Sequence, residues 1–294
     1  MTGAVDKQGL AARLGLTLLN LVLVVVIGGF AAAALVRYSP GFDVDENSWN
    51  PRISAATSEA LHASRARENE LPRFYLNYLS AALRGDFGQS DSLKVPVSEL
   101  LRDRAPVTTR LIVFGTAGGL FLGALLAWLA VWPRKSAGEI FSVTISGFFL
   151  AIPPAVLALF FFFEEAPLWI AVAFAVLPRV FGTIRAVLAN VHASPSLLAA
   201  RARGVRPLTL AVRHVAGAAL PQWIALAGVT LVLAFGVIIP IEALCDVPGI
   251  GQLAWKAALS RDLPLLCGLA LIITFVVACA QSLGELLGWE GIGR

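Results

Sequence analysis

Charged side chains are scarce in this sequence. Only 14% of its 294 residues are Asp, Glu, Lys or Arg, whereas a soluble domain has about 25%. Hydrophobic residues make up 57%, and a water-exposed surface built from so many of them would carry large apolar patches. A lipid bilayer accepts such side chains. The composition therefore excludes an ordinary cytosolic enzyme and a disordered chain, and it predicts a membrane protein.

Cysteine is also scarce, with only Cys245, Cys267 and Cys279 in the chain. These residues have neither C-x-x-C spacing nor a histidine nearby, so we expect no disulfide framework and no metal site. They are interpreted as small apolar side chains. Lys and Arg do not cluster among aromatic residues, which argues against nucleic-acid binding.

Uncharged runs in the sequence mark the membrane spans. Crossing about 30 Å of hydrocarbon takes about 20 helical residues. One apolar stretch, Ala166–Pro178, is too short unless the helix continues through Arg179 and Arg185, whose long side chains can snorkel to the interface. With that extension the sequence predicts an all-α protein with six transmembrane helices at 14–36, 111–133, 140–163, 166–190, 215–241 and 263–284.

The distribution of Lys and Arg predicts the orientation of these spans. With the N-terminal segment 1–13 inside, and with the third inner segment counted from Arg179 to His214, the inner segments hold eleven basic residues and the short outer loops hold two. Loops rich in Lys and Arg stay in the cytoplasm, so both termini are expected there, including the tail 285–294. The segment 37–110 carries ten basic and ten acidic residues, which predicts a polar, water-exposed extracytoplasmic domain.

The first span has an alternative interpretation as a cleaved signal peptide. Small residues at Ala31–Ala34 would suit a cleavage site. The 23-residue apolar run is longer than the 7 to 15 residues of a typical signal peptide, so an uncleaved helix is favoured.

Two spans contain residues that shape helices. Gly115, Gly119 and Gly123 form overlapping G-x-x-x-G spacings, which bring a helix face close to a neighbouring backbone. That neighbour is either in this chain, which the spacing favours, or in another subunit. Pro153-Pro154 removes backbone donors from the third span and is expected to kink it.

The inner segment 191–214 is expected to contain a short helix. Ser194-Pro195 suits a helix N-cap followed by proline, residues 196–203 give about two helical turns, and Gly204 suits the left-handed residue after a helix. One interpretation is a basic loop that only holds topology. The other is a docking element for a cytoplasmic partner.

This inner segment resembles the cytoplasmic coupling loop of binding-protein-dependent ABC importer permeases. In the dipeptide, oligopeptide and nickel branch that loop reads approximately A-R-A-K-G, followed by R-H before the next span. The matching residues here are Ala200, Arg201, Ala202, Arg203, Gly204, Arg213 and His214.

Three other segments resemble the same branch, in the same order. Gly85-Asp86-Phe87-Gly88-Gln89-Ser90 is similar to its G-D-L-G-x-S signature. The segment 96–108 is similar to the P-V-x-x-L-L-x-x-R-L-P-x-T entry to the second span. The segment 242–264, which begins at Glu242 and ends in Arg-Asp-Leu-Pro, is similar to the stretch between the fifth and sixth spans. Four motifs in order on six spans identify the chain as a member of this branch.

The resemblance implies a type I ABC importer permease core over residues 111–290, in a bacterial inner membrane. It also implies several partners: a second permease subunit in a heterodimer, cytoplasmic ABC ATPase subunits, an extracytoplasmic substrate-binding protein and lipid. The chain has no Gly-Lys dipeptide and hence no phosphate-binding P-loop, so it is expected to be no enzyme and to bind no cofactor. ATP and Mg²⁺ would be bound by the partner ATPases, and the cargo would be peptides or a related small solute such as nickel.

Two groups of residues acquire expected roles from the resemblance. Contact with the ATPase is expected at Ser196, Ala200, Arg201, Ala202, Arg203, Gly204, Arg213 and His214. The outer gate and the binding-protein contact are expected at Glu242, Pro248, Gly249, Gly251, Arg261 and Asp262. Glu242 has an alternative interpretation as a solvated residue at the end of a span.

Other functional classes fit the sequence less well. A membrane-embedded enzyme would need a motif such as H-E-x-x-H or G-x-S-x-G, and neither occurs. A secondary transporter would usually show ionisable residues in mid-membrane and an internal repeat. A receptor or scaffold that kept the permease fold but lost transport is the main alternative.

Overall fold

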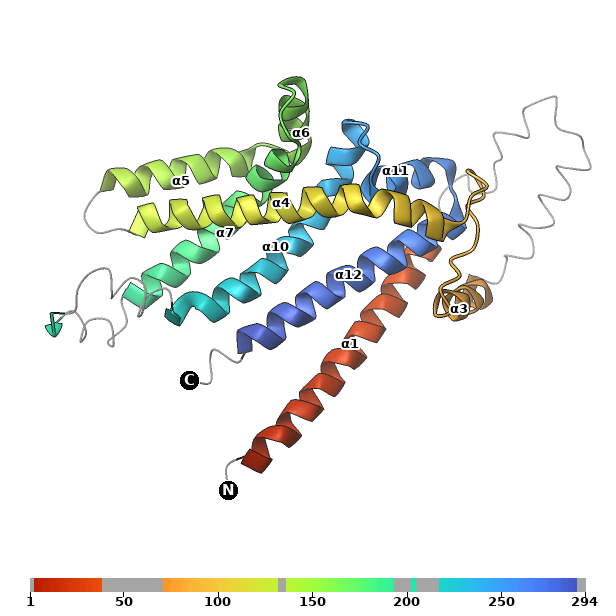
Figure 1. The fold of residues 1–294 in the computed structure, drawn as a ribbon, viewed down its shortest axis with the longest axis horizontal. Helices are drawn as coiled ribbons and strands as arrows, with labels where there is room; N and C mark the ends of the chain where they lie inside the picture. Colours follow the sequence, from red (N-terminus) through yellow and green to blue (C-terminus); the bar gives the residue numbers. More distant parts are fainter. Residues whose placement is uncertain (1–2, 39–70, 132–135, 193–201, 205–216, 290–294) are drawn as a thin grey trace, which may run out of the picture. The chain divides into compact units, whose positions relative to one another are not determined.

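The structure, a computed structural model, describes residues 3–38, 71–131, 136–192, 202–204 and 217–289. Its helices are α1 (Gly3–Arg37), α3 (Leu71–Ala82), α4 (Val97–Val131), α5 (Ser136–Ala151), α6 (Pro154–Phe163), α7 (Trp169–His192), α10 (Gly217–Leu244), α11 (Ile250–Ser260) and α12 (Leu263–Trp289) (Figure 1). Within these residues no β-strand forms, and extended backbone pairs only in an isolated bridge between Gln89 and Pro96. The fold is all-α, as the sequence predicts.

Several helices are long and apolar enough to cross a membrane. In the described part of the chain they are Gly15–Leu35, Val97–Val131, Trp169–Asn190, Ala225–Leu244 and Leu263–Ser282. The bent pair α5–α6 makes a sixth if its two arms count as one span. The number agrees with the six predicted spans. Helix α7, which corresponds to the fourth predicted span, runs without interruption through Arg179 and Arg185, as predicted.

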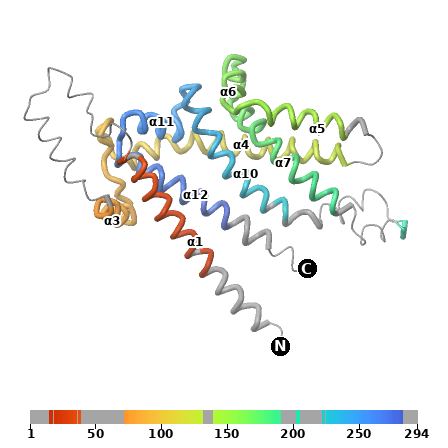
Figure 2. The backbone as a smooth tube through the Cα atoms, turned by 180° about the vertical axis from the view of Figure 1, so that it is seen from behind, coloured from red at the N-terminus to blue at the C-terminus, as the bar shows by residue number. Residues whose placement is uncertain are grey.

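The third predicted span, 140–163, is not one continuous helix. α5 ends at Ala151, α6 begins at Pro154, and the two axes differ by 94° (Figures 1 and 2). Neither proline can donate a backbone hydrogen bond, so the break falls where the sequence predicts a kink. The segment is therefore a bent pair of helices with two axes, and it makes the sixth span if its two arms count as one.

Packing on α7 explains why both arms are held at this angle. The Phe174 ring of α7 stacks on Phe149 of α5, with 4.3 Å between ring centroids, and on Phe161 of α6, with 5.8 Å. One aromatic side chain therefore contacts both arms of the break.

Helix ends differ from the ends of the apolar runs. α4 begins at Val97 rather than near Leu111, and α12 continues to Trp289. At 1.5 Å per residue, the 35 residues of α4 are about 52 Å long, well beyond the hydrocarbon thickness. An apolar run marks only the part of a helix that lies in the bilayer. The helix itself can extend beyond that part, because its backbone hydrogen bonds also form in water. The segment 242–262, predicted as an outer loop, contains the eleven-residue helix α11.

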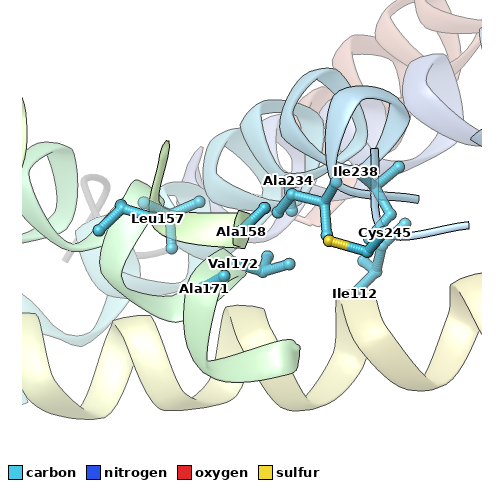
Figure 3. Packing of buried hydrophobic residues seen from close by; sticks show 10 residues of the cluster. Ile112, Leu157, Ala158, Ala171, Val172, Ala234, Ile238 and Cys245 are labelled. Carbon is cyan, nitrogen blue, oxygen red and sulfur yellow. The ribbon is translucent and has the colours of Figure 1, made fainter. Parts of the chain in front are cut away.

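The chain divides into two compact units, described here separately. The first comprises Met1–Ala105 and Leu253–Phe275, and the second comprises Pro106–Gln252 and Val276–Arg294. In the second unit α4, α6, α7 and α10 share a buried core (Figure 3). Its buried members are Ile112, Leu157, Ala158, Ala171, Val172, Val176, Ala234, Ile238, Ile241 and Cys245.

The core of the first unit gathers around two tyrosines of α3. Tyr75 and Tyr78 are buried together with Cys267 and Leu271 of α12. The Tyr75 hydroxyl donates to the Val26 carbonyl of α1 at 2.8 Å, and Figure 1 shows α3 beside α1. The segment 37–110, which the sequence predicts to be a water-exposed domain, thus buries these two tyrosines. Its balanced charges lie on other side chains and leave an apolar face of α3 free to pack.

Candidate functional site

Two buried carboxylates delimit the segment that the sequence assigns to the outer gate. Glu242 has an exposed fraction of 0% and Asp262 one of 1%. Glu242 belongs to the second unit and Asp262 to the first, and each has its own set of hydrogen-bond donors. The alternative that Glu242 is a solvated end residue is wrong.

The Glu242 carboxylate caps the start of α11. Its Oε2 accepts the backbone N–H of Gly251 at 2.6 Å and of Gln252 at 3.3 Å, while its Oε1 accepts the Thr108 hydroxyl of α4 at 2.7 Å. The Thr108 oxygen in turn accepts the Ile250 N–H at 2.7 Å. A helix leaves its first N–H groups without internal partners, and here three of them are satisfied by side chains of α10 and α4.

The charge of Glu242 suits this position for a second reason. The N-terminus of a helix carries a partial positive charge, which favours a carboxylate close by. Hydrogen bonds to an ionised acceptor are also stronger than those between neutral groups. Glu242 and Thr108 therefore fasten α11 to α10 and α4 within the second unit.

Two glycines leave room for this carboxylate. A Cβ atom built on Gly249 would lie 2.2 Å from Cδ and both oxygens of Glu242. A Cβ on Gly251 would lie 2.8 Å from the Ile239 Cα. Glycine at positions 249 and 251 thus leaves room for the Glu242 side chain and for the Ile239 backbone, respectively. Pro248 itself is exposed.

The Asp262 carboxylate joins α12 to the segment before α4. As the N-cap of α12, its Oδ1 accepts the Leu265 N–H at 3.1 Å. Its Oδ2 accepts the hydroxyls of Ser90 at 2.5 Å and Ser92 at 2.7 Å, and the Ser92 N–H at 2.9 Å. Four donors therefore converge on one carboxylate. Arg261, the residue before it, is exposed and adopts a φ of 53° in the turn that ends α11.

These donors outweigh the effect of burial on the acidity of Asp262. Desolvation alone would raise the pKa of a buried carboxyl group. The hydrogen bonds from Ser90, Ser92 and Leu265 act in the opposite direction, and the net result holds the pKa of Asp262 below its ordinary value. The ionised form is thus the form that the fold stabilises.

The Gly-Asp-Phe-Gly-Gln-Ser motif forms the loop that presents Ser90. Gly85 and Gly88 adopt φ values of 83° and 70°, and the Asp86 carboxylate accepts the Gly88 N–H at 2.9 Å. The Tyr78 hydroxyl lies within hydrogen-bonding distance of the carbonyls of Phe87, at 3.1 Å, and Pro264, at 3.0 Å. Two motifs 172 residues apart in the chain therefore meet at Ser90 and Asp262.

Sequence reasoning missed three residues of these networks. Thr108 stands inside a recognised motif but was given no role, and Ser92 lies outside any motif. The burial of Tyr78 could have been predicted, because Tyr75, Tyr78 and Ala82 repeat at helical spacing on one face of α3. For Ser92 and Thr108 no local pattern indicates a carboxylate partner more than 130 residues away.

The glycine stripe of α4 packs against valines of α7. Cβ atoms built on Gly115, Gly119 and Gly123 would lie 2.5, 2.3 and 2.6 Å from side-chain atoms of the α7 residues that face them. Those residues are Val172, Val176 and Val180, with the same four-residue spacing. The stripe therefore contacts a helix of the same chain, the first of the two alternatives.

We predict that Gly119→Ala destabilises the α4–α7 contact. Its Cβ would lie 2.3 Å from Val176 Cγ2 and 3.0 Å from the Ala173 carbonyl oxygen. Overpacking of this kind costs about 1–3 kcal/mol, measurable as a lower thermal midpoint in detergent. Gly147→Ala in α5, where no atom lies within 4 Å, is the matched control. A Gly119→Ala protein that melts like the Gly147→Ala protein would contradict the contact, and adding Val176→Ala should restore part of the loss.

Only the end of the expected coupling element lies within the described residues. Ala202, Arg203 and Gly204 are exposed, and Gly204 has a φ of 73°, the left-handed conformation expected from the sequence. The other residues assigned to it are outside the described part of the chain: Ser196, Ala200, Arg201, Arg213 and His214.

An ion pair lies between the helices that precede this segment. Arg185 of α7 donates to Glu139 of α5 at 2.5 Å, and both side chains are substantially exposed. Glu139 directly precedes the uncharged run 140–163, so the pair marks one edge of the apolar layer in the second unit.

The remaining candidates show no reactive arrangement. Cys245 and Cys267 are buried, Cys279 is partly buried, and none of the three forms a disulfide. Among the residues that the structure describes, no group of three His, Cys, Asp or Glu side chains is close enough to hold a metal ion.

The sequence and the fold both match known proteins. Residues 119–287 match the family described as "binding-protein-dependent transport system inner membrane component". A Brucella ovis protein named as a peptide permease is 28% identical, with 86% of this chain and 88% of that protein covered. The nickel import system permease protein NikB of Staphylococcus aureus is 23% identical, with 92% and 87% covered. A chain of the MetNI methionine ABC transporter in an inward-facing conformation has a similar fold, with a TM-score of 0.58 and 16% identity over 65% of this chain and 96% of that one.

Proposed function

From the premise that this chain belongs to the family of binding-protein-dependent transport system inner membrane components, we propose that it forms half of the translocation pathway of an ATP-driven importer of peptides. The observation that carries the proposal is the match over residues 119–287, which spans α7, the coupling segment and the outer segment alike. Peptide cargo rests on the relative from Brucella ovis, and the nickel permease relative makes nickel the second cargo to test.

We place both termini and the segment 191–214 in the cytoplasm of a bacterium, on the inner membrane. The excess of Lys and Arg in the corresponding loops supports this orientation. The pair Glu139–Arg185 then lies at the cytoplasmic edge of the apolar layer, next to the start of the coupling segment.

The coupling segment is proposed to dock on a partner ATPase. This chain has no P-loop, so the energy for transport has to come from another subunit. The exposed turn at Ala202, Arg203 and Gly204 offers two features of a docking element, a basic side chain and a fixed left-handed residue. A second permease subunit, in a heterodimer, would complete the pathway.

The outer segment is proposed to face the substrate-binding protein. Pro248 is exposed there, while Glu242 and Asp262 are buried. The two carboxylates hold the backbone at either end of the segment, and Pro248 lies on the surface between them.

The proposal is tested with the complete importer, purified with its second permease and ATPases and reconstituted in liposomes with its binding protein. Gly204→Val should abolish ATP-dependent peptide uptake while the variant still inserts in the membrane, because a β-branched residue disfavours a φ of 73°. Gly204→Asn is the matched control, since asparagine tolerates this conformation and should retain most uptake.

Three outcomes would change the proposal. Uptake by the Gly204→Val importer would remove the coupling assignment. Import of nickel but of no peptide would change the cargo. A complete complex that binds its binding protein but imports neither would identify a scaffold or receptor.

A further inference from the structure

Arg179 places a positive charge in the middle of a membrane span. It is the eleventh residue of the span Trp169–Asn190, and its side chain is exposed on the surface of the chain. The sequence interpretation assumed that Arg179 lies near a helix end, from which its side chain reaches the interface. The structure puts it in the interior of a continuous helix instead.

The neighbouring helix α4 gives an independent measure of how deep Arg179 lies in the apolar layer. Val180, the next residue, packs on Gly123 of α4, where a built Cβ would lie 2.6 Å from Val180 Cγ1. Gly123 is twelve residues from Leu111 and ten from Pro133, the ends of the uncharged run of α4. At 1.5 Å per residue it lies about 18 Å from Leu111 and about 12 Å from Val131, the last residue of α4, and so in the interior of the apolar layer.

The ion pair Arg185–Glu139 provides a second reference. Because Glu139 directly precedes the uncharged run 140–163, the pair marks the nearer edge of the apolar layer. Arg179 lies six residues, or about 9 Å, further into the layer than Arg185. Side chains of a helix lean toward its N-terminus, which for Arg179 means away from that edge. Reaching the interface by snorkelling is therefore unfavourable.

The exposed face around Arg179 does not resemble a lipid-facing surface. Among the described side chains of α7 the exposed ones are Arg179, Gly182, Ala186, Ala189 and Asn190. None is a large apolar residue, whereas α4 exposes Phe114, Phe121, Leu125 and Leu129. A Cβ on Gly182 would meet no atom within 4 Å. This small-residue face runs from Arg179 to Asn190.

We propose that this face of α7 lines the translocation pathway and that Arg179 binds the carboxylate of a peptide cargo there. A charged side chain in mid-membrane almost always faces a water-filled cavity or an opposite charge, because hydrocarbon contact is strongly disfavoured. A face that exposes no large apolar side chain from Arg179 to Asn190 suits a passage, whereas a local contact with another subunit would not need that length. The inference rests on the proposed peptide import and extends it to the chemistry of the cargo. A bare divalent cation would be repelled at this point.

The first test is transport by reconstituted importers that carry Arg179→Gln or Arg179→Lys. Arg179→Gln should lower the maximal rate of uptake of a short peptide with a free carboxylate by about tenfold, the loss expected when one charged hydrogen-bond partner is removed. Arg179→Lys, which keeps the positive charge, should retain most of the rate. Arg84→Gln, which removes an exposed arginine outside the spans, is the matched control and should leave uptake unchanged. Equal uptake by the Arg179→Gln and wild-type importers would overturn the inference and leave the proposed function intact.

The second test does not depend on the cargo. In an importer without its native cysteines, Arg179→Cys and Ala186→Cys should react with a membrane-impermeant thiol reagent. Phe121→Cys on the large-apolar face of α4 should not react. An unreactive Arg179→Cys would overturn the inference, and loss of the second permease from an Arg179→Gln complex would assign Arg179 to a subunit contact. If the wild-type importer takes up no peptide, the proposed function fails, while the labelling still decides whether the face is lined by water.

Discussion

Replacing Glu242 with Leu should destabilise the protein by about 3 kcal/mol or more and abolish transport. The substitution removes the acceptor for the N–H groups of Gly251 and Gln252 and for the Thr108 hydroxyl. A buried donor left without a partner costs about 1–3 kcal/mol, and three donors are affected here. At the start of α11 the N–H groups of Gly251 and Gln252 would then lose the acceptor that Glu242 provides, and only Thr108 would still accept the Ile250 N–H.

Graded substitutions separate the charge from the hydrogen bonds. Glu242→Gln keeps one acceptor oxygen but places an amide donor next to backbone N–H groups, so it should fall between wild type and Glu242→Leu. Thr108→Val should cost about 1–2 kcal/mol because the Ile250 N–H loses its acceptor. Thr108→Ser, which keeps the hydroxyl, is the matched control and should remain close to wild type.

The measurements are thermal unfolding in detergent and peptide uptake in liposomes for each variant. Because Thr108 and Glu242 share one network, the effects of Thr108→Val and Glu242→Gln should not add, with a coupling of about 0.5–3 kcal/mol in the double variant. Additive effects, or a Glu242→Leu protein as stable as wild type, would show that the carboxylate does not cap α11.

The spans were predictable because the physics that sets them is local. A run of about 20 uncharged residues suffices to identify a membrane-crossing helix, whatever it packs against. The same holds for the turn at Gly204, whose left-handed φ follows from the absence of a side chain. The break at Pro153-Pro154 was expected for a local reason, but its angle of 94° depends on Phe174 of a different helix.

The candidate site was predictable in part. Glu242 and Asp262 were identified by motif, but their burial and their partners were not. Helix α11 was read as a loop because it is only eleven residues long and begins at a Pro-Gly-Ile-Gly turn. Its first turn is completed by Thr108 and Glu242, which lie on other helices. No window of the local sequence contains that information.

The second large effect is expected for Asp262→Asn, which should lower stability by about 2–3 kcal/mol. Both oxygens of Asp262 accept from donors, Oδ1 from the Leu265 N–H and Oδ2 from Ser90 and Ser92. An asparagine amide has one oxygen and one NH₂ group. In either orientation the NH₂ group therefore faces another donor, and one hydrogen bond that depends on the charged group is lost.

The same network predicts how stability changes with pH. Hydrogen bonds to the ionised carboxylate hold the folded-state pKa of Asp262 below its ordinary value of 3.8. A depressed folded-state pKa contributes stability above the unfolded-state value, and this contribution is lost as the pH falls through the folded-state value. The thermal midpoint of the wild type should therefore exceed that of Asp262→Asn at neutral pH, and the difference should shrink as the pH falls below about 4.

Matched variants decide whether this behaviour belongs to the Asp262 network. Ser90→Ala removes one donor and should reproduce part of the loss in the thermal midpoint, with a smaller dependence on pH than in wild type. Asp103→Asn neutralises an exposed carboxylate on α4 and should change the midpoint little at any pH. If wild type and Asp262→Asn differ by the same amount at pH 7 and below pH 4, the pKa of Asp262 is the same in the folded and the unfolded protein. The contact between the Gly-Asp-Phe-Gly-Gln-Ser loop and α12 would then not favour the ionised carboxylate.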